Sequence, residues 1–222
     1  MSTPDRRFVP ALRFGWATRF YDGAIRVLFD EETLRGRLVV AAEVREGHRV
    51  LDLGCGTAAT TLAIKRHCPR ATVVGLDPDP TALNIARRKA RASGLDVELV
   101  QGTAASLLAA GSDRFDRVVS SLVLHHLAPP EKRATLSAAR QLLRPGGELH
   151  VLDWARPRGA LRRGGFFLVR LLDGLVNTAD NAHGRLPDFF REAGFIAVAE
   201  TATVDTWLGT LGFYRAESPD SA

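Results

Sequence analysis

Four side chains able to do chemistry stand at the ends of apolar stretches in this sequence. Asp52 and Asp77 each close such a stretch, and His125 and His126 follow a third one. Carboxylates accept strong hydrogen bonds from hydroxyl groups, and an imidazole can take up a proton near neutral pH. Because the carboxyl ends of parallel strands meet at one edge of a sheet, we expect the four residues to border one site.

The first of these stretches runs into a turn that contains Gly54 and Gly56, with Cys55 between them. A strand that enters a glycine-broken turn and then a helix brings the backbone close to a nucleotide-like ligand. The glycines tolerate unusual backbone angles and leave no side chain in the way. The helix expected over Thr57 to about His67 would point free N–H groups at a carboxylate or phosphate. The pattern predicts a cofactor site, although a tight turn without a ligand would have the same sequence.

The composition is that of an ordinary globular protein. The chain has 222 residues, 45% of them hydrophobic and 25% charged, which suits one domain with one sizeable core. Two cysteines, Cys55 and Cys68, are too few for a disulfide scaffold or a thiolate metal cage, so we expect no metal and a reducing, cytoplasmic setting. The charged N-terminus indicates neither a signal peptide nor a membrane span.

The formal net charge of +5 and the pI near 9.8 come almost entirely from arginines spread along the chain. A coding bias towards arginine and an affinity for anionic partners would give the same excess. The sequence contains no nucleic-acid recognition module and no face that combines aromatic and basic residues, so nucleic acid is a weak candidate partner.

Strand-like and helix-like segments alternate every roughly twenty to thirty residues, which is typical of βαβ units and a parallel sheet. The clearest helix has Asp79 as its N-cap and Pro80 in its first turn, and it ends at Gly94. The expected strands are Arg49 to Leu53, Ala71 to Asp77, Val97 to Val100, Phe115 to Leu124 and Glu148 to Trp154, and a further helix is expected over Glu131 to Leu143.

The two ends of the chain do not follow this alternation. Residues 1–45 have apolar side chains at helical spacing and predict a helical cap ahead of the core, residues 49–154. An insertion at 155–183 is first basic and then apolar, with a helix expected over Phe166 to Val176. Residues 184–216 predict a helix, Leu186 to Ala193, and two strand-like runs, Phe195 to Val204 and Trp207 to Tyr214.

Four stretches in this order resemble the class I S-adenosylmethionine-dependent methyltransferases, and within them the small-molecule branch that includes the ubiquinone and menaquinone biosynthesis enzymes. They are Val50 to Thr57, Val74 to Asp79, Phe115 to Leu127 and Leu142 to Asp153. Their most specific parts are Asp-Leu-Gly-Cys-Gly-Thr, Gly-Leu-Asp and Leu-Leu-Arg-Pro-Gly-Gly. The resemblance implies a Rossmann-like, doubly wound, mostly parallel α/β sheet of seven strands whose last strand is antiparallel and belongs to a C-terminal hairpin.

The resemblance also implies a bound S-adenosylmethionine. Asp77 would accept hydrogen bonds from two ribose hydroxyls, and Asp52 would orient the turn near the amino-acid portion of the cofactor. Leu76 and Pro78 would flank the adenosine, or belong to the core and the turn. The cofactor-binding set expected on this basis is Asp52, Gly54, Cys55, Gly56, Asp77, Pro78, Gly102, Thr103 and Ser120.

Two residues depart from the family's pattern. Ala58 stands where a third glycine is frequent, which costs little if its φ is negative. Thr103 stands where an aspartate often contacts the adenine amino group, and its hydroxyl or a backbone carbonyl could still bond the adenine edge. We therefore expect cofactor binding to survive, and a nonfunctional cofactor site is the alternative.

The acceptor side is expected around Ser120, Ser121, His125 and His126, at the carboxyl end of the fourth strand. Either histidine could take a proton from the acceptor as the methyl group leaves sulfur, or one could merely pack or cap the turn before Pro129. Because the sulfonium already activates the carbon, alignment alone could also suffice.

The N-terminal cap and the insertion would cover the site from two sides. Tyr21, the third catalytic candidate, and its neighbours Trp16 and Phe20 could face the sulfonium or pack in the core. The basic and apolar residues from Arg156 to Val176 need a partner, which could be the core, a greasy acceptor beneath a lid, or a membrane surface. A polar cluster follows, which could line the acceptor pocket or build a turn: Asn177, Asp180, Asn181 and His183.

We therefore predict an enzyme that moves a methyl group from S-adenosylmethionine to a small, lipophilic acceptor, such as a lipid or a quinone-like molecule. An NAD(P)-binding oxidoreductase is a rival, disfavoured because Ala59 replaces the third glycine of Gly-x-Gly-x-x-Gly. A noncatalytic S-adenosylmethionine-binding regulator is another. The sequence fixes neither the acceptor, nor whether carbon, oxygen or nitrogen is methylated, nor the oligomeric state.

Overall fold

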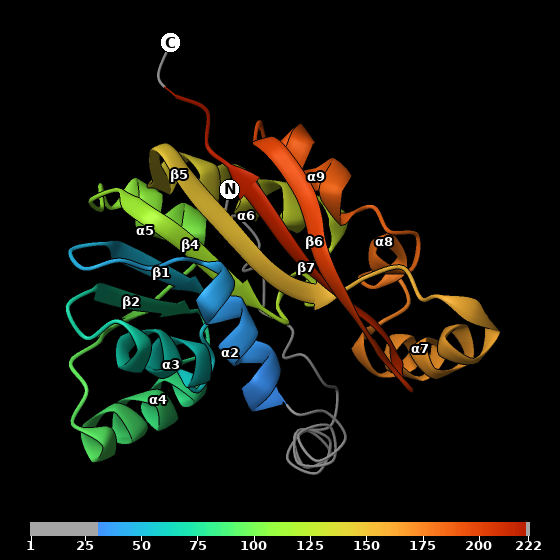
Figure 1. Cartoon of the computed structure of the whole chain (residues 1–222), viewed down its shortest axis with the longest axis horizontal. Coiled ribbons are helices and arrows are strands. Elements are labelled where there is room, and N and C mark those ends of the chain that lie inside the picture. The colour runs from blue at the N-terminus through green and yellow to red at the C-terminus, as the bar shows by residue number, and fades with distance from the viewer. Residues whose placement is uncertain (1–30, 221–222) are drawn as a thin grey trace, which may run out of the picture.

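Seven strands run side by side in the computed structural model, which describes residues 31–220, and their order is β3-β2-β1-β4-β5-β7-β6 (Figure 1). All neighbouring pairs are parallel except those that involve β7, which runs antiparallel to β5 and β6. This confirms the predicted sheet. The strands are β1 (Arg49–Leu53), β2 (Thr72–Asp77), β3 (Glu98–Gln101), β4 (Phe115–Ser121), β5 (Leu143–Trp154), β6 (Ile196–Thr206) and β7 (Gly209–Glu217).

The register of the central strands brings their carboxyl ends together. Leu53 of β1 lies opposite Leu76 of β2, and Ser121 of β4 lies opposite Leu152 of β5. The residues that follow these strands therefore emerge at one edge of the sheet, next to the point where the chain leaves β1 for one side and β4 for the other. This is where an open α/β sheet forms its ligand crevice.

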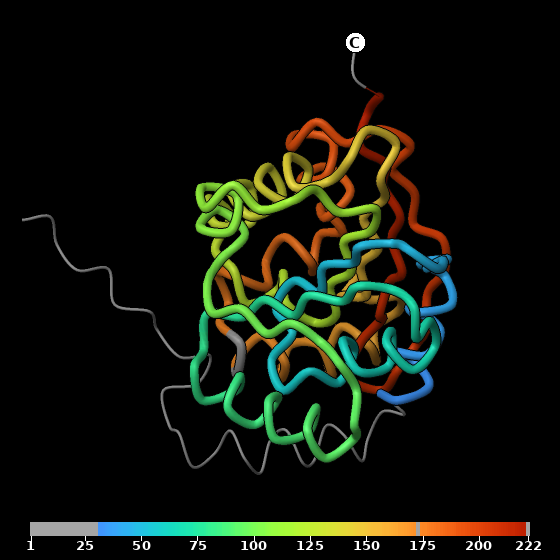
Figure 2. The backbone as a smooth tube through the Cα atoms, turned by 90° about the vertical axis from the view of Figure 1, so that its left-hand side faces the viewer, coloured from blue at the N-terminus to red at the C-terminus, as the bar shows by residue number. Residues whose placement is uncertain are grey.

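Helices cover both faces of the sheet, so the apolar strands are buried on two sides (Figure 2). One face carries α2, α3 and α4, and its core includes Leu38 and Ile64. The other face carries α5, α6 and α9, and its core includes Phe115, Leu136 and Phe189. The bounds of these helices are α2 (Glu31–Ala41), α3 (Ala59–His67), α4 (Pro80–Ser93), α5 (Ala104–Ala109), α6 (Pro129–Leu142) and α9 (Leu186–Glu192).

Helix α4 forms where the capping signals predicted it. Asp79 Oδ1 accepts a hydrogen bond from the backbone N–H of Thr81 at 2.7 Å, Pro80 occupies the first turn, and Gly94 ends the helix with φ +65°. Helix α5 was not predicted, because it is short and has little apolar periodicity. Its start is nevertheless stabilised by reciprocal hydrogen bonds between Thr103 and Ser106.

Several strand boundaries differ from the predicted ones by one to five residues, and those of β4 and β5 change how the strands connect to their neighbours. Strand β4 stops at Ser121 because Leu122 adopts φ +58°, which breaks the extended backbone before the 3-10 turn η1 (Leu124–His126). Strand β5 starts at Leu143 rather than at Glu148, so the Arg-Pro-Gly-Gly segment that ends α6 is already part of the sheet, with an irregular register against Phe115 and Arg117.

The insertion forms α7 (Gly159–Asp173) and the short α8 (Ala179–Ala182), and α7 packs on the sheet's hairpin end. Phe166 contacts the Trp154 ring with 5.3 Å between ring centroids. A Cβ on Gly165 would lie 2.1 Å from the carbonyl oxygen of Trp207, so only glycine permits this approach. Helix α7 begins at Gly159, seven residues before the predicted start at Phe166.

The N-terminal cap is described only from α2 onward. Tyr21, Trp16 and Phe20, which were expected to cover the cofactor, lie outside the described residues. Within the described part of the chain, no helix has both the length and the apolar content that a membrane crossing requires.

Candidate active site

The glycine turn is fixed by backbone hydrogen bonds to the neighbouring strand. The N–H groups of Gly54 and Cys55 both donate to the carbonyl oxygen of Leu76, at 2.8 and 3.0 Å. Gly54 and Gly56 have φ of +74° and +52°, in the region that glycine enters without a steric penalty. The end of β2 therefore shapes the turn at the end of β1.

The two glycines serve different neighbours. A Cβ on Gly54 would lie 2.5 Å from Cγ2 of Val123, so this glycine makes room for the loop that follows β4. A Cβ on Gly56 would meet nothing within 4 Å. Open space above a positive-φ glycine next to a helix N-terminus is what a bound cofactor needs, so Gly56 marks the ligand side of the turn.

Asp77 ties the second strand to this turn. Its Oδ2 accepts a hydrogen bond from the Gly56 N–H at 2.8 Å, and its Oδ1 accepts one from the Asp79 N–H at 2.8 Å. Burial raises the pKa of the Asp77 carboxyl, although both backbone hydrogen bonds act in the opposite direction. A carboxylate offers about four lone-pair sites, so a half-buried Asp77 can accept further hydrogen bonds from a ligand.

Asp52 is a buried carboxyl with one hydroxyl partner. Its side chain is 1% exposed, and Thr61 of α3 donates its hydroxyl to Oδ2 at 2.6 Å. Burial raises the pKa of Asp52 to about 6, against the lowering effect of the Thr61 hydrogen bonds. A cation brought next to Asp52 would stabilise its ionised form. In this structure the carboxyl anchors the end of β1 to α3 through Thr61.

Other members of the predicted cofactor set have partners within the protein. The hydroxyl of Ser120 donates to the Leu53 carbonyl oxygen at 3.0 Å and is buried. The hydroxyl of Thr103 accepts from the Ser106 N–H at 3.2 Å as the cap of α5. Burial raises the pKa of the Cys55 thiol, which keeps it neutral. These three residues support the walls of the site through the backbone and the core.

Leu76, Pro78 and Gly102 differ in how far they are buried. Leu76 is 1% exposed and belongs to the core, whereas Pro78 is exposed. Gly102 follows β3 with φ +156°, and a Cβ there would lie 2.5 Å from the Ser106 hydroxyl. Of the two apolar walls considered for the adenosine, only Pro78 therefore has accessible surface.

The backbone of Ala58 contradicts the condition under which alanine was expected to cost little. Its φ is +64°, in the left-handed region, where it precedes the first residue of α3. A side chain in this region costs roughly 1–2 kcal/mol. Helix α3 consequently starts at Ala59 instead of Thr57, and Ala58 carries strain that a third glycine would remove.

His125 forms a buried pair with Asp153, the last but one residue of β5. Nδ1 of His125 lies 2.8 Å from Asp153 Oδ1, and the histidine is 4% exposed. Asp153 Oδ2 accepts from the Leu124 N–H at 2.7 Å, and Oδ1 accepts from the Trp154 N–H at 2.7 Å. Burial alone would raise the pKa of Asp153, but His125 and the backbone donor outweigh it and hold the pKa below its ordinary value. An ionised Asp153 can only accept, so Nδ1 of His125 carries a proton.

His126 lies beside this pair, but its pKa is lowered. Its ring centroid is 3.9 Å from that of His125. Burial, with the neighbouring His125 ring, lowers the pKa of His126 to about 3, so the ring stays neutral in the physiological range. Of the two histidines, His125 is thus the one held by a carboxylate, the arrangement that makes an imidazole an effective base.

The polar cluster of the insertion packs around a buried lysine. Asn177, Asp180 and Asn181 surround the buried ammonium of Lys132, and Asn181 Nδ2 also lies 3.4 Å from Asp153 Oδ1. His183 is exposed, with Nδ1 2.7 Å from the Ala179 carbonyl oxygen.

Sequence reasoning missed several members of the site. Asp153 ends a strand just as Asp52 and Asp77 do, so the same rule could have found it. Thr61 and Lys132 gave no such signal, because both lie within helices. The partners of Lys132 are also 45 to 49 residues away in sequence.

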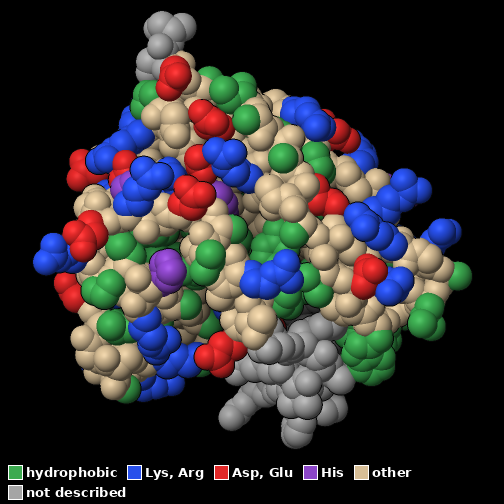
Figure 3. All heavy atoms as spheres, in the orientation of Figure 1, with side chains coloured by type: hydrophobic (Ala, Val, Ile, Leu, Met, Phe, Trp, Pro, Cys, Tyr) green, Lys and Arg blue, Asp and Glu red, His purple; other side chains and the backbone are tan. Residues whose placement is uncertain are grey.

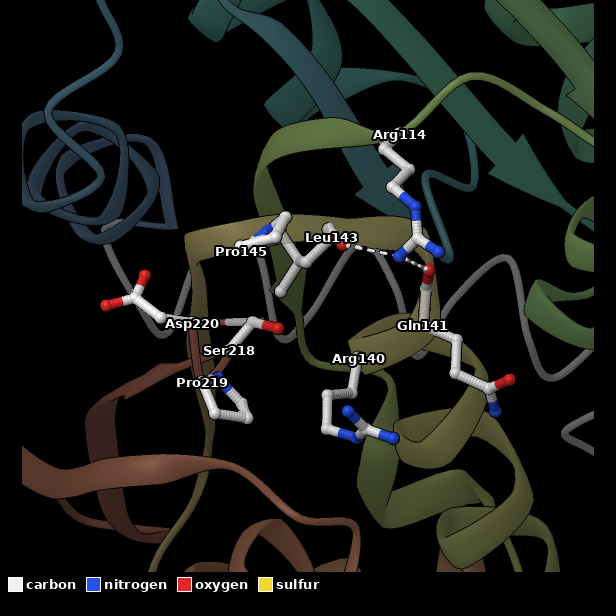
Figure 4. A pocket seen from close by; sticks show the side chains of 8 residues that line it. All are labelled: Arg114, Arg140, Gln141, Leu143, Pro145, Ser218, Pro219 and Asp220. Atoms are coloured by element: carbon white, nitrogen blue, oxygen red, sulfur yellow. Dashed lines mark hydrogen bonds between the residues drawn. The ribbon is translucent and has the colours of Figure 1, made fainter. Parts of the chain in front are cut away.

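A separate cavity of about 270 Å³ lies at the opposite edge of the sheet, beside the start of β5 (Figure 4). The guanidinium of Arg114 donates there to the carbonyl oxygens of Gln141 and Leu143, at 2.8 and 3.1 Å. These bonds satisfy carbonyl groups at the end of α6. The cavity lies at the other end of the strands, so it does not belong to the site described above. Among residues 31–220, no group of three or more His, Cys, Asp or Glu side chains is arranged to hold a metal ion.

Comparison with known proteins assigns the same stretches to one family. A family model described as a methyltransferase domain matches residues 50–147. The chain is 35% identical over 163 residues to a demethylmenaquinone methyltransferase from Thermus thermophilus, an alignment that covers 69% of this chain and 71% of that protein. It is 41% identical over 102 residues to a ubiquinone biosynthesis O-methyltransferase from Cereibacter sphaeroides, covering 46% of this chain but only 39% of that protein.

Solved structures share the fold. An O-methyltransferase family protein from Burkholderia thailandensis superimposes with a TM-score of 0.68, covering 91% of this chain and 59% of that one at 23% identity. At this identity the likeness supports the fold, while the sequence relatives support the chemistry.

Proposed function

We propose that this chain, which belongs to the class I S-adenosylmethionine-dependent methyltransferases, methylates a small, lipophilic acceptor that binds beside His125. S-adenosylmethionine is the cofactor of this family, and it supplies a methyl group that its sulfonium already makes electrophilic. The remaining tasks are to hold the cofactor, to align the acceptor and to accept a proton where the acceptor must lose one.

The residues around the glycine turn fit this cofactor. Gly56 leaves the space above the turn open, and Asp77 is half-buried at the end of β2 with lone pairs left for ribose hydroxyls. Asp52, bonded to Thr61, would orient the turn near the amino-acid portion of the cofactor. Pro78 would contact the adenosine, and the backbone around Gly102 and Thr103 would meet its base edge.

The observation that carries the acceptor side is the His125–Asp153 pair. The carboxylate holds the proton on Nδ1, so Nε2 is the basic nitrogen of His125. His126, with a pKa of about 3, is a weak base and is better suited to contact the acceptor as a neutral ring. We therefore assign the proton-accepting role to His125, while the part played by Tyr21 remains a prediction.

A lipophilic acceptor is supported by the relatives' names and by the surface of α7. Apolar side chains on and after α7 are open to solvent, among them Leu161 at 83% and Val176 at 70% exposure. Arginines lie between and before them, so green and blue side chains adjoin over α7 at the right of Figure 3. Such a surface fits contact with an anionic membrane, from which a quinone-like acceptor would be delivered.

Two free cysteines, Cys55 and Cys68, fit a reducing, cytoplasmic location.

A labelled-methyl screen tests the proposed activity. The protein is incubated with methyl-labelled S-adenosylmethionine and a panel of quinols, phenols, lipids and polar control acceptors, and the products are identified by mass spectrometry. We expect label in a lipophilic product. Label confined to polar acceptors or to protein would contradict the proposed acceptor class.

Two adjacent phenylalanines of α7 test the membrane contact separately. Phe166 is 1% exposed and packs on Trp154, whereas Phe167 is 52% exposed. Phe167→Ser should reduce sedimentation with anionic liposomes and leave the unfolding transition in place. Phe166→Ser is the matched control and should lower stability by about 3 kcal/mol or more through loss of core packing. Equal liposome binding by wild type and Phe167→Ser would remove the membrane role.

A further inference from the structure

Lys132 of α6 joins the insertion to the turn that carries the histidines. Its side chain is fully buried, and its ammonium nitrogen lies 2.6 Å from the Asn177 carbonyl oxygen, 3.4 Å from Asp180 Oδ2 and 3.4 Å from Asn181 Oδ1. An ammonium has three N–H donors and no acceptor, so three oxygens satisfy it. A buried lysine without such partners would be strongly destabilising.

This geometry fixes the direction of the Asn181 amide. Because Lys132 can only donate, the amide oxygen of Asn181 must face it, and Nδ2 faces the other way. There Nδ2 donates to the Trp154 carbonyl oxygen at 2.7 Å and approaches Asp153 Oδ1 at 3.4 Å. Asn181 is fully buried, so water does not replace either partner.

The same network reaches both histidines. Asp153 Oδ1 accepts from His125 Nδ1 as well as from Asn181, so the amide and the imidazole share one carboxylate oxygen. Asn177 Nδ2 donates to the His126 carbonyl oxygen at 2.8 Å. Contacts therefore run from Lys132 through Asn181 and Asp153 to the ring of His125, between residues far apart in sequence.

We propose that Asn181 and Lys132 are positioning residues that hold the His125–Asp153 pair in one hydrogen-bonded arrangement, with the His125 proton on Nδ1. A buried polar network is specific only when every member is satisfied, and the loss of one partner leaves the others with alternatives. The catalytic consequence rests on the proposed function of His125, but the arrangement itself is measurable without turnover.

Within the described residues, Asp153 of β5 is the charged group that contacts His125, and the neutral His126 ring lies beside it. Lys132 of α6 is linked to Asp153 through Asn181, while Asp180 of α8 pairs with both Lys132 and Arg185. Loss of the Lys132 charge should make His125 easier to protonate, and loss of the Asp180 charge should make it harder. The two changes therefore have opposite signs.

Nitrogen-15 NMR of histidine-labelled full-length protein reads the tautomer and titration of His125, with His125→Gln used to assign its signals. In wild type we expect the ring to be held as the Nδ1–H tautomer. Asn181→Leu should mix the tautomers. Lys132→Met should shift the His125 titration upward by roughly half a pH unit or more, and Asp180→Asn should shift it downward.

Arg133→Met is the matched control, because Arg133 follows Lys132 on α6 and forms an exposed ion pair with Glu192 at 2.8 Å. It should leave the His125 signals unchanged. If Asn181→Leu or Lys132→Met does not fold, Asn181→Ser and Asp180→Asn provide the same readouts with smaller changes. Unchanged tautomer and titration in the folded variants would overturn the proposal.

Turnover separates this inference from the proposed function. If His125→Gln retains full activity while the NMR changes occur, the positioning network stands and the base assignment fails. If His125→Gln is inactive but Asn181→Leu keeps the wild-type pH profile and tautomer, the base assignment stands and the positioning role is wrong.

Discussion

The two halves of the site are built by different means. On the cofactor half, backbone N–H donors fix the turn between β1 and α3: those of Gly54 and Cys55 donate to the Leu76 carbonyl oxygen, and that of Gly56 donates to the Asp77 carboxylate. On the acceptor half, side chains hold the turn η1: Asp153 accepts from the Leu124 N–H and pairs with His125, and Asn177 donates to the His126 carbonyl oxygen. Lys132 and Asn181 bind Asn177 and Asp153 in turn.

This difference matches the two ligands: the cofactor is common to the family, whereas the acceptor is particular to one protein. Backbone hydrogen bonds and glycines can shape a cofactor cradle in any chain of this family, whatever the acceptor. Side-chain networks between distant elements depend on each partner being present, so they suit the half that must fit a particular acceptor. Changes in the two halves should therefore affect different quantities.

The largest effect is expected at His125. His125→Ala should lower kcat by about 10²–10⁴-fold, because it removes the imidazole that accepts the proton. His126→Ala, measured beside it, should retain far more activity, since the pKa of His126 is only about 3. Steady-state kinetics with the acceptor found in the methyl screen provide the comparison. Near-normal kcat in His125→Ala would show that alignment suffices.

Substituting Gly54 and Gly56 by alanine should show which glycine is needed for packing within the protein and which leaves space for the cofactor. Gly54→Ala combines a positive φ with a clash against Val123 and should lower the free energy of unfolding by about 2–4 kcal/mol. Gly56→Ala meets no atom and should cost only the strain of about 1–2 kcal/mol, but it should weaken cofactor binding. Denaturant unfolding and cofactor titration separate the two effects. Equal stability of both variants would contradict the packing difference.

Asp52 should make the stability of the cofactor-free protein depend on pH. The pKa of Asp52 is about 6 in the folded protein, above the 3.8 that is ordinary for an aspartate, so between these values the folded state binds the proton more tightly. Stability should therefore fall as pH rises from about 4 through 6, by up to about 3 kcal/mol. Asp52→Asn should remove this fall, being more stable than wild type at pH 7 and similar at pH 3. If Asp52→Asn were less stable than wild type at pH 7, burial of the ionised Asp52 carboxyl would not be destabilising.

The smallest effect is expected at Ala58. Ala58→Gly relieves left-handed backbone strain but removes a buried methyl group, so a net gain of only about 0.5 kcal/mol is expected. Cofactor affinity should change less than about twofold. Thermal unfolding and calorimetry test both expectations. A several-fold change in affinity would place the Ala58 methyl group against the ligand.

The cofactor half was predictable because its signals are local. The glycine turn, the strand-end aspartates and the Asp79–Pro80 cap each lie within a few residues of the structure that they specify, and all appear where they were expected. Two features of this half were not predicted: the positive φ of Ala58, and Thr61 as the partner of Asp52.

The acceptor half was predictable only in outline. His125 and His126 were placed correctly at the end of β4, but their different environments depend on Asp153 and Lys132, which no local pattern connects to them. The insertion's polar residues could be recognised as a cluster, yet not as the partners of a buried lysine. Phe166 and Phe167 are identical in type, and only packing against Trp154 separates them into core and surface.

Calorimetric titration of S-adenosylhomocysteine into wild type, Asp77→Ala and His125→Ala tests the division of the site most directly. Loss of hydrogen bonds to the Asp77 carboxylate should weaken binding by about 1.5–3 kcal/mol, roughly tenfold to more than a hundredfold in Kd. His125→Ala should bind within about twofold of wild type. Unchanged affinity in a folded Asp77→Ala variant, or an equal loss in His125→Ala, would contradict it.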